Sequence, residues 1–361
     1  MAFATSSPQD RGSKADNPSN DNANGAERKR FAGRFLLSFA GTLVFLLVVL
    51  CGVVTATDPN RYFFGSPVPQ IWPNPTRTKV ELFREYTARQ PVTGFLFGSS
   101  RSALLRPDQA DRITGLRFFN ATVYNSSTEH YLALYRLFRK IQPTPPKMLV
   151  VGMEPLLLSS GYSLPKDLSA SYPLMSQLDA GLTIPWHYAK VYALYFRTET
   201  LIDLYTSLKN WRSPQVPLDK YFADGHIESA DPANARHLLK EHFDAQLGLY
   251  RPFRGISDGH VESLRSFLRE ASADHTRILL WMTPMHPLLR QAIDRLPEVP
   301  EAERRARGII NDLAAEFHAQ IVDLSAPESF GGDPSGWLDG LHVNSDTAQL
   351  EMNRFLAPVQ N

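Results

Sequence analysis

The stretch Gly94–Ser102, with the sequence GFLFGSSRS, indicates the fold class of the whole chain. Residues 92–97 are mostly apolar, which is typical of a short buried β-strand. The strand runs into Gly98, which permits a tight turn, and the hydroxyl groups of Ser99 and Ser100 follow at once. In α/β sheets the reacting groups lie just beyond the carboxyl ends of the strands. We therefore expect chemistry at this turn.

Short apolar runs and amphipathic runs alternate on either side of this strand. Further strands are predicted at residues 116–123, 147–152, 277–282 and 320–324, and helices at 79–89, 128–141, 301–318 and from about 345 to 356. Such alternation predicts a three-layer α/β/α sandwich with a mostly parallel five-stranded sheet.

The alternation is lost between about residues 155 and 275. Aromatic residues cluster between Trp186 and Trp211, within plausible helices. We therefore expect a large helical insertion here, packed over the carboxyl edge of the sheet.

A second candidate site lies near the end of the chain, in the segment Asp339–His342 before the last predicted helix. A serine hydroxyl needs a base within hydrogen-bond reach, and the base needs an orienting carboxylate. The carboxyl ends of parallel strands meet at one edge of the sheet. We therefore expect the Ser100 hydroxyl to approach one ring nitrogen of His342 and Asp339 to approach the other.

This arrangement resembles the SGNH (GDSL-type) hydrolase and acyltransferase superfamily. In that family a Gly-Asp-Ser-like turn after the first strand carries the nucleophile, and a late Asp-x-x-His carries the rest of the triad. The resemblance implies that Ser100 is the nucleophile, with Ser99 in the usual aspartate position. It also implies that His342 is the base and that Asp339 orients it.

The resemblance further implies an oxyanion hole that begins with the backbone N–H of Ser100. The family usually adds a glycine N–H after the second strand and an asparagine side chain after the third. Here Asn125 stands in the glycine position, and Gly152–Glu154 contains no asparagine. This loss is similar to the envelope-associated acyltransferase branch, such as the teichoic-acid D-alanylation protein and alginate O-acetylation proteins, which are tethered outside the membrane.

Several other residues can be interpreted either as functional or as purely structural. Arg101 is expected either to steer an anionic substrate group or to form a salt bridge. His286 is expected either to line the pocket or to be a loop histidine. The tripeptides Asp224–His226 and Asp258–His260 are both predicted to be turns, because a metal site needs more ligands at fixed spacing.

The composition excludes several classes of protein. With 361 residues, of which 43% are hydrophobic, the chain has enough material for one large domain. A formal net charge of +1 gives no indication of nucleic-acid binding. A single cysteine, Cys51, excludes a disulfide framework. No Walker loop, Gly-x-Gly-x-x-Gly or His-Glu-x-x-His motif is present, so no cofactor or metal is expected.

The N-terminal part of the chain predicts a membrane anchor. Residues 1–30 are polar for most of their length and are expected to form a disordered cytoplasmic tail. Residues 35–54 carry no charge, and Arg28, Lys29, Arg30 and Arg34 lie just upstream, which predicts a transmembrane helix at about 34–56 with its N-terminus inside. A juxtamembrane linker and short helix are expected at 57–90, and the SGNH-like domain at 91–361, outside the cytoplasm.

The apolar segment has three alternatives to a membrane anchor. Val54–Ala56 offers a cleavage site for a signal peptide, but the basic and apolar regions are both long for one. A lipoprotein signal at Cys51 fits poorly, because Leu50 precedes it and Cys51 lies inside the apolar run. A buried soluble helix would not need the basic flank. The length favours an uncleaved anchor.

Two functions are expected from these features. The first is a membrane-anchored serine acyl-transfer protein, an O-acyltransferase or esterase, at the bacterial inner membrane. It would act outside the cytoplasm on carbohydrate or an acylated envelope polymer, with a membrane-bound acyl-donor protein as a possible partner. The alternative is a non-catalytic scaffold that binds glycan or an assembly partner. Ser100, Asp339 and His342 favour the enzyme, and the segment Gly152–Glu154 favours the scaffold.

Overall fold

The computed structural model describes residues 18–58, 74–195, several positions between 202 and 209, 219–229 and 238–357. The chain divides into two compact units, residues 1–56 and 57–361. Residues 59–73 of the predicted juxtamembrane linker lie outside the described residues, as do residues 1–17 of the predicted tail.

The first unit contains one long helix, α1, which runs from Pro18 to Thr57. Its part Arg28–Thr57 contains an 18-residue window with a mean hydropathy of 2.6 and is long and apolar enough to cross a membrane. The prediction of a disordered tail is wrong from Pro18 onward, because α1 already begins there. Extending an existing helix adds one hydrogen bond per residue without a new nucleation step, so the apolar helix can continue into a polar segment.

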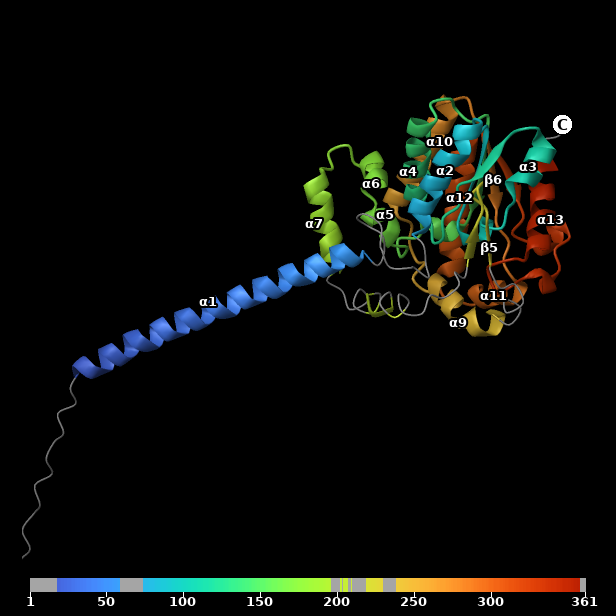
Figure 1. Ribbon diagram of the computed structural model, residues 1–361. Helices are drawn as coiled ribbons and strands as arrows, with labels where there is room; N and C mark the ends of the chain where they lie inside the picture. The colour runs from blue at the N-terminus through green and yellow to red at the C-terminus, as the bar shows by residue number, and fades with distance from the viewer. Residues whose placement is uncertain are drawn as a thin grey trace, which may run out of the picture. The chain divides into compact units, whose positions relative to one another are not determined.

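The second unit is built on a five-stranded parallel sheet with the strand order β2-β1-β3-β6-β7 (Figure 1). The strands are β1 Gly94–Phe97, β2 Phe118–Asn120, β3 Met148–Met153, β6 Arg277–Met282 and β7 Gln320–Asp323. The predicted parallel sheet is confirmed. From β1 the chain passes first to β2 on one side and then to β3 on the other, so the strand order reverses at β1. Ligands bind at such a reversal, beyond the carboxyl ends of the strands.

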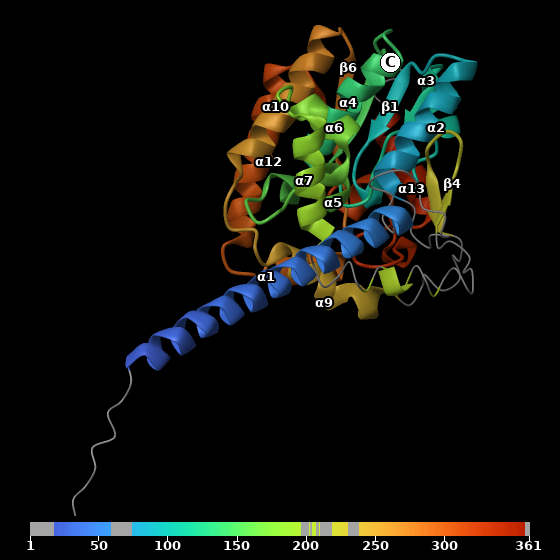
Figure 2. The same cartoon turned by 60° about the vertical axis from the view of Figure 1, so that its left-hand side comes forward.

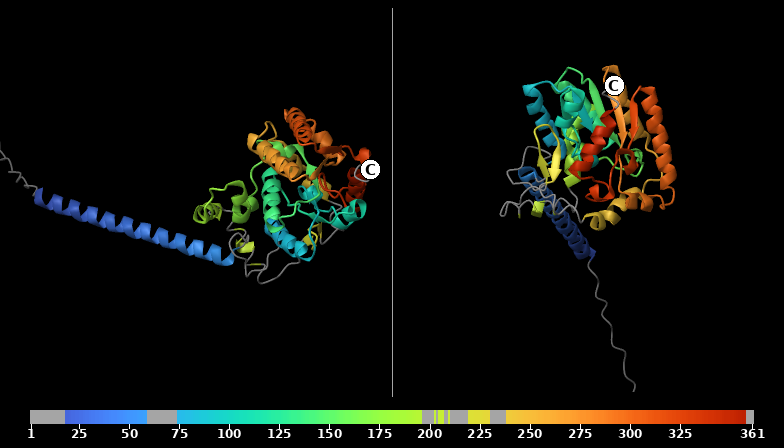
Figure 3. Two further views of the ribbon diagram at one scale, coloured as in Figure 1. Left: turned by 90° about the horizontal axis from the view of Figure 1, so that it is seen from above. Right: turned by 90° about the vertical axis from the view of Figure 1, so that its right-hand side faces the viewer.

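Helices cover both faces of the sheet, which completes the predicted three layers (Figures 1 and 3). One layer consists of α2 Pro75–Arg89, α4 Thr128–Ile141, α10 Asp258–Ala273 and α12 Val299–Glu316. The other consists of α3 Pro107–Thr114 and α13 Ser345–Leu356.

The alternation of side chains along the strands produces two separate cores. Phe95 and Phe97 of β1 belong to the larger core, under α2, α4, α10 and α12. Leu96 belongs to the smaller core, under α3 and α13. Successive side chains of a strand point to opposite faces, so an uninterrupted apolar strand is buried on both sides. In the smaller core, Trp281 of β6 stacks on Phe355 of α13 with ring centroids 4.9 Å apart.

One helix, α2, begins earlier than predicted, and a second helix, α3, was not predicted. The helix predicted at 79–89 begins at Pro75, because Asn74 caps it by accepting the N–H of Arg77 at 3.0 Å. It belongs to the domain rather than to a linker, since Phe83 is fully buried. Helix α3 was not predicted, although it has proline at its first position and Gly115 after its end with φ 70°.

The insertion is smaller and more varied than predicted. Helix α10 packs on α4 and β6 as an ordinary crossover helix, so the insertion ends before Asp258. It contains η2 Pro155–Leu158, α5 Lys166–Ala170, α6 Tyr172–Leu178, α7 Ile184–Tyr195, the strands β4 Asp219–Tyr221 and β5 Ile227–Ser229, and α9 Leu238–Tyr250. Only part of it covers the carboxyl edge: α6 packs on α4 at the side, whereas α9 packs on α11 Pro287–Ile293 at that edge.

The antiparallel hairpin β4–β5 lies beside α2 at the end of β2 (Figure 2). The buried Lys79 of α2 donates to the carbonyl oxygens of Asn120, at 3.0 Å, and Gly225. Gly225 has φ 88°, and a Cβ there would lie 2.2 Å from the Asn120 oxygen, so the hairpin turn requires glycine. The turn predicted at Asp224–His226 is confirmed. Asp258–His260 is instead the first turn of α10.

A buried carboxyl group on α13 predicts a pH-dependent stability. Burial raises the pKa of Glu351 to about 8, against an opposing effect of Arg101, and its Oε1 has no hydrogen-bond partner among the described residues. Because the pKa of Glu351 is higher in the folded state, the protonated side chain stabilises the fold fully below its unfolded pKa of about 4.3. This stabilisation is lost as the pH rises toward 8.

We therefore expect Glu351→Gln to stabilise the protein at pH 8 much more than at pH 5, because the neutral amide carries no charge to desolvate. Thermal unfolding of both proteins at the two pH values measures this difference. An equal effect of the substitution at pH 5 and pH 8 would contradict it.

Candidate active site

The turn after β1 places Ser100 at the start of a short 3-10 helix, η1 Ser100–Ser102. A Cβ on Gly98 would lie 2.0 Å from the Ser102 Oγ, so the turn requires glycine at this position. Ser99 caps η1 by accepting the N–H of Arg101 at 3.3 Å. Ser100 is therefore presented beyond the carboxyl end of β1.

The loop that precedes α13 folds back on itself around Asp339. The N–H of Leu338 donates to the His342 carbonyl at 2.8 Å. One carboxylate oxygen of Asp339, Oδ1, accepts the N–H groups of Leu341 at 2.7 Å and His342 at 2.8 Å. These bonds fix the carboxylate and the imidazole relative to each other within four residues.

The expected contacts between the two ends of the domain are present. The Nε2 of His342 lies 2.8 Å from the Oγ of Ser100, which is 242 positions away in the sequence. Its other ring nitrogen, Nδ1, lies 2.7 Å from Oδ2 of Asp339. Ser100, His342 and Asp339 thus form a continuous hydrogen-bonded chain with the geometry of an activated nucleophile.

The charge of Asp339 determines the direction of these hydrogen bonds. Burial raises the pKa of the Asp339 carboxyl, but the His342 ring and the N–H groups of Leu341 and His342 lower it by more, so the pKa lies well below its usual range. The ionised carboxylate can only accept, so Nδ1 of His342 carries a proton. In the neutral imidazole Nε2 is then the acceptor for the Ser100 hydroxyl.

This arrangement can transfer an acyl group. As the Ser100 Oγ attacks a carbonyl carbon, Nε2 of His342 takes the hydroxyl proton, and Asp339 stabilises the imidazolium that forms. The same proton can then be given to the leaving group. An acyl-serine would remain, to be released by water or by another hydroxyl.

Arg101 does not have the free side chain that anion steering requires. It is buried, and its Nε lies 3.4 Å from Oε2 of Glu154, the residue that follows β3. It also donates to the hydroxyls of Thr283, at 3.1 Å, and Tyr250, at 2.8 Å. Burial lowers the pKa of the guanidinium, but Glu154 and Tyr250 raise it by more, so Arg101 stays charged. The salt-bridge reading of Arg101 is the correct one.

The same contacts give Glu154 a structural role at the position where the resemblance had led us to expect asparagine. The carboxylate of Glu154 accepts the hydroxyl of Ser99 and pairs with Arg101. Arg101 therefore balances the charge of Glu154 beside the turn that carries Ser100. Glu154 connects the ends of β1 and β3, a role that sequence reasoning missed.

The oxyanion position is only partly defined. Among the hydrogen bonds outside helices and strands of the described residues, none uses the backbone N–H of Ser100. Asn125 is exposed and has φ 51°, a conformation that glycine adopts most readily. Among the described residues, no hydrogen bond joins Asn125 to Ser100.

His286 supports the acid-base loop and does not contact Ser100. It caps α11, because its Nδ1 accepts the N–H of Leu288 at 3.2 Å, and its ring meets Trp337 edge to face at 6.0 Å. Its backbone N–H donates to the Gly340 carbonyl at 3.0 Å. Burial lowers the pKa of its imidazole.

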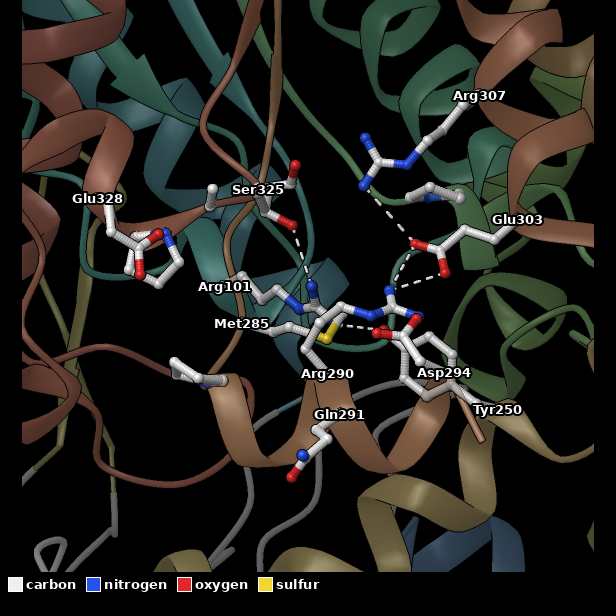
Figure 4. A pocket seen from close by; sticks show the side chains of 15 residues that line it. Arg101, Tyr250, Met285, Arg290, Gln291, Asp294, Glu303, Arg307, Ser325 and Glu328 are labelled. Atoms are coloured by element: carbon white, nitrogen blue, oxygen red, sulfur yellow. Dashed lines mark hydrogen bonds and ion pairs between the residues drawn. The ribbon is translucent and has the colours of Figure 1, made fainter. Parts of the chain in front are cut away.

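A pocket of about 420 Å³ lies next to the nucleophile turn (Figure 4). Arg101, Tyr250 and Thr283 line it, together with charged residues of α11 and α12. Arg290 pairs there with Glu303 at 2.7 Å and with Asp294 at 2.7 Å. Ser100 and His342 are not among its lining residues, so the pocket adjoins the triad through Arg101 and does not contain it. In the described part of the chain, no group of three or more potential ligands could hold a metal ion.

The comparisons with known proteins yield structural similarity only. No protein-family model matches the chain, and no curated protein matches it. The chain is similar to the solved structure of a GDSL-like lipase from Bacteroides thetaiotaomicron, with 10% sequence identity, a TM-score of 0.37, and coverage of 77% of this chain and 98% of that chain. It is also similar to phospholipase A1 from Streptomyces albidoflavus, with 11% identity, a TM-score of 0.33, and coverage of 74% and 98%.

Proposed function

We propose that this protein is a serine-dependent acyl-transfer enzyme, an esterase or O-acyltransferase, in which Ser100 is the nucleophile. The observation that carries the proposal is the hydrogen-bonded chain from Ser100 through His342 to Asp339. The three side chains come from opposite ends of the domain, and the acceptor-only carboxylate sets the tautomer that a base requires. A serine that only formed a turn would not need this geometry.

A fluorophosphonate probe tests the proposal directly, because it reacts covalently with activated serines. We expect the full-length protein in detergent to be labelled on the peptide that contains Ser100, and heat-denatured protein to remain unlabelled. Peptide mass spectrometry locates the label. Absence of labelling on the folded protein, or labelling at another serine, would contradict the proposal.

One observation favours a scaffold that keeps the fold without catalysis. The segment Gly152–Glu154 lacks the asparagine that would add a donor to the oxyanion hole, and Glu154 is committed to Arg101. A scaffold would still bind glycan or an assembly partner after substitution of Ser100. An enzyme would lose its activity after the same substitution.

We also propose a location and a substrate class for the domain. We place the domain outside the cytoplasm of a bacterial cell, attached to the inner membrane by α1. A carbohydrate or acylated envelope polymer would be the substrate, and a membrane-bound protein would supply the acyl group if the reaction is a transfer. The basic residues Arg28, Lys29, Arg30 and Arg34 precede the uncharged residues 35–54 of α1 and support this orientation, because positive flanks stay in the cytoplasm.

The orientation makes a separate prediction. A reporter that is active only outside the cytoplasm is expected to work when fused after Asn361, and a reporter active only inside is expected to work at the N-terminus. Parallel fusions to both ends provide the control. Activity of only the cytoplasmic reporter at the C-terminal fusion would refute the proposed location.

A further inference from the structure

Helix α9 of the insertion presents one face to the candidate active site. His242, Gln246 and Tyr250 are spaced four residues apart, so they lie on the same side of the helix. Figure 1 shows α9 beside α11, and the two helices pack against each other at the carboxyl edge of the sheet. Each of the three residues reaches a different part of the site.

The central contact fixes the backbone between the acid and the base. The Oε1 of Gln246, a buried side chain, accepts the N–H of Gly340 at 3.0 Å. The carbonyl of the same glycine accepts the N–H of His286 at 3.0 Å. A Cβ on Gly340 would lie 2.4 Å from the Gln246 Oε1 and 2.7 Å from the Leu289 Cδ2. Only glycine allows the loop to approach α9 and α11 this closely.

The other two contacts lie on either side of this bond. The Nδ1 of His242 lies 3.6 Å from Oδ2 of Asp339, the oxygen that also binds His342. The hydroxyl of Tyr250 accepts from Arg101, the neighbour of the nucleophile, at 2.8 Å. Within three helical turns α9 thus contacts both the acid-base loop and the nucleophile turn.

We propose that α9 holds the acid-base loop in register with the nucleophile and that Gln246 is its principal positioning residue. This inference rests on the proposed acyl-transfer function. Gln246 touches neither substrate nor reacting atoms, and it acts by fixing the Gly340 peptide and with it the direction of the Asp339 carboxylate. Small displacements of such groups reduce the rate of the chemical step more than they reduce substrate binding.

The test compares two variants at one position. Gln246→Leu keeps the volume but removes the acceptor, and Gln246→Glu keeps an acceptor. With a small ester such as p-nitrophenyl acetate, we expect Gln246→Leu to lower kcat by about tenfold with little change in KM, since a buried N–H then lacks its partner. Gln246→Glu should recover most of kcat. Glu241→Leu, on the exposed side of α9, is the matched control and should behave as the wild type.

Hydrogen–deuterium exchange adds a measurement that does not depend on activity. The Gly340 amide should exchange faster in Gln246→Leu than in the wild type or in Glu241→Leu, and the peptide spanning residues 337–342 reports this. If Gln246→Leu does not fold, Gln246→Asn replaces it, because its amide is one methylene group too short to reach Gly340.

The outcomes separate this inference from the proposed function. Unchanged exchange, or faster exchange with wild-type kcat, would overturn the role of Gln246. A wild-type protein that neither hydrolyses the ester nor reacts with the fluorophosphonate would refute the proposed function, and with it the kinetic role of Gln246. The exchange measurement would then still decide whether α9 fixes the loop.

Discussion

Ser100→Ala is expected to reduce acyl transfer by about 10⁴-fold or more while leaving the protein folded. The substitution removes one oxygen from a side chain that is only partly buried. His342→Ala should cost about as much, because members of such a chain act as a unit and their losses do not add. Ester hydrolysis by the full-length protein, together with its circular dichroism spectrum, measures both effects.

Two further variants sharpen this expectation. Asp339→Asn should cost less than either substitution, because the base remains beside Ser100 although its tautomer is no longer fixed. Ser102→Ala is the matched control: it also removes a serine hydroxyl from η1, and that hydroxyl has no hydrogen-bond partner among the described residues. A Ser100→Ala protein with full activity would leave the scaffold as the remaining function.

Glu154→Ala is expected to lower the free energy of unfolding by about 3–5 kcal/mol, because it leaves a buried positive charge without its partner. The Arg101 and Glu154 side chains are only 5% and 8% exposed, so water cannot replace the carboxylate. The Ser99 hydroxyl would lose its acceptor at the same time. Denaturant unfolding monitored by tryptophan fluorescence gives the difference.

An exposed ion pair of the same domain serves as the control for Glu154. Arg77 and Glu81 of α2 lie 2.8 Å apart, but their side chains are 40% and 53% exposed. Glu81→Ala should therefore change the free energy of unfolding by less than about 1 kcal/mol. If Glu154→Ala were no more destabilising than Glu81→Ala, the cluster around Arg101 would not be a stabilising feature.

Local patterns in the sequence determined the architecture and the principal site. The apolar run before Gly98 predicts β1, and the spacing of strands and helices predicts the parallel sheet. Once the sheet is parallel, the turn at Ser100 and the loop at His342 must lie at the same edge, because all the strands end there. Asp339 and His342 are three positions apart, so a single loop can hold their geometry.

Only the tertiary structure decided what surrounds this site. Gln246 contacts Gly340 across 94 positions, Tyr250 contacts Arg101 across 149, and Glu154 contacts Ser99 across 55. No periodicity or short motif encodes such pairs, because each depends on where separate elements come to rest. Burial then fixes their chemistry: it makes Arg101 an ion-pair partner rather than a ligand for anions. The sequence thus determined which groups could react, and the fold decided which side chains hold them in place.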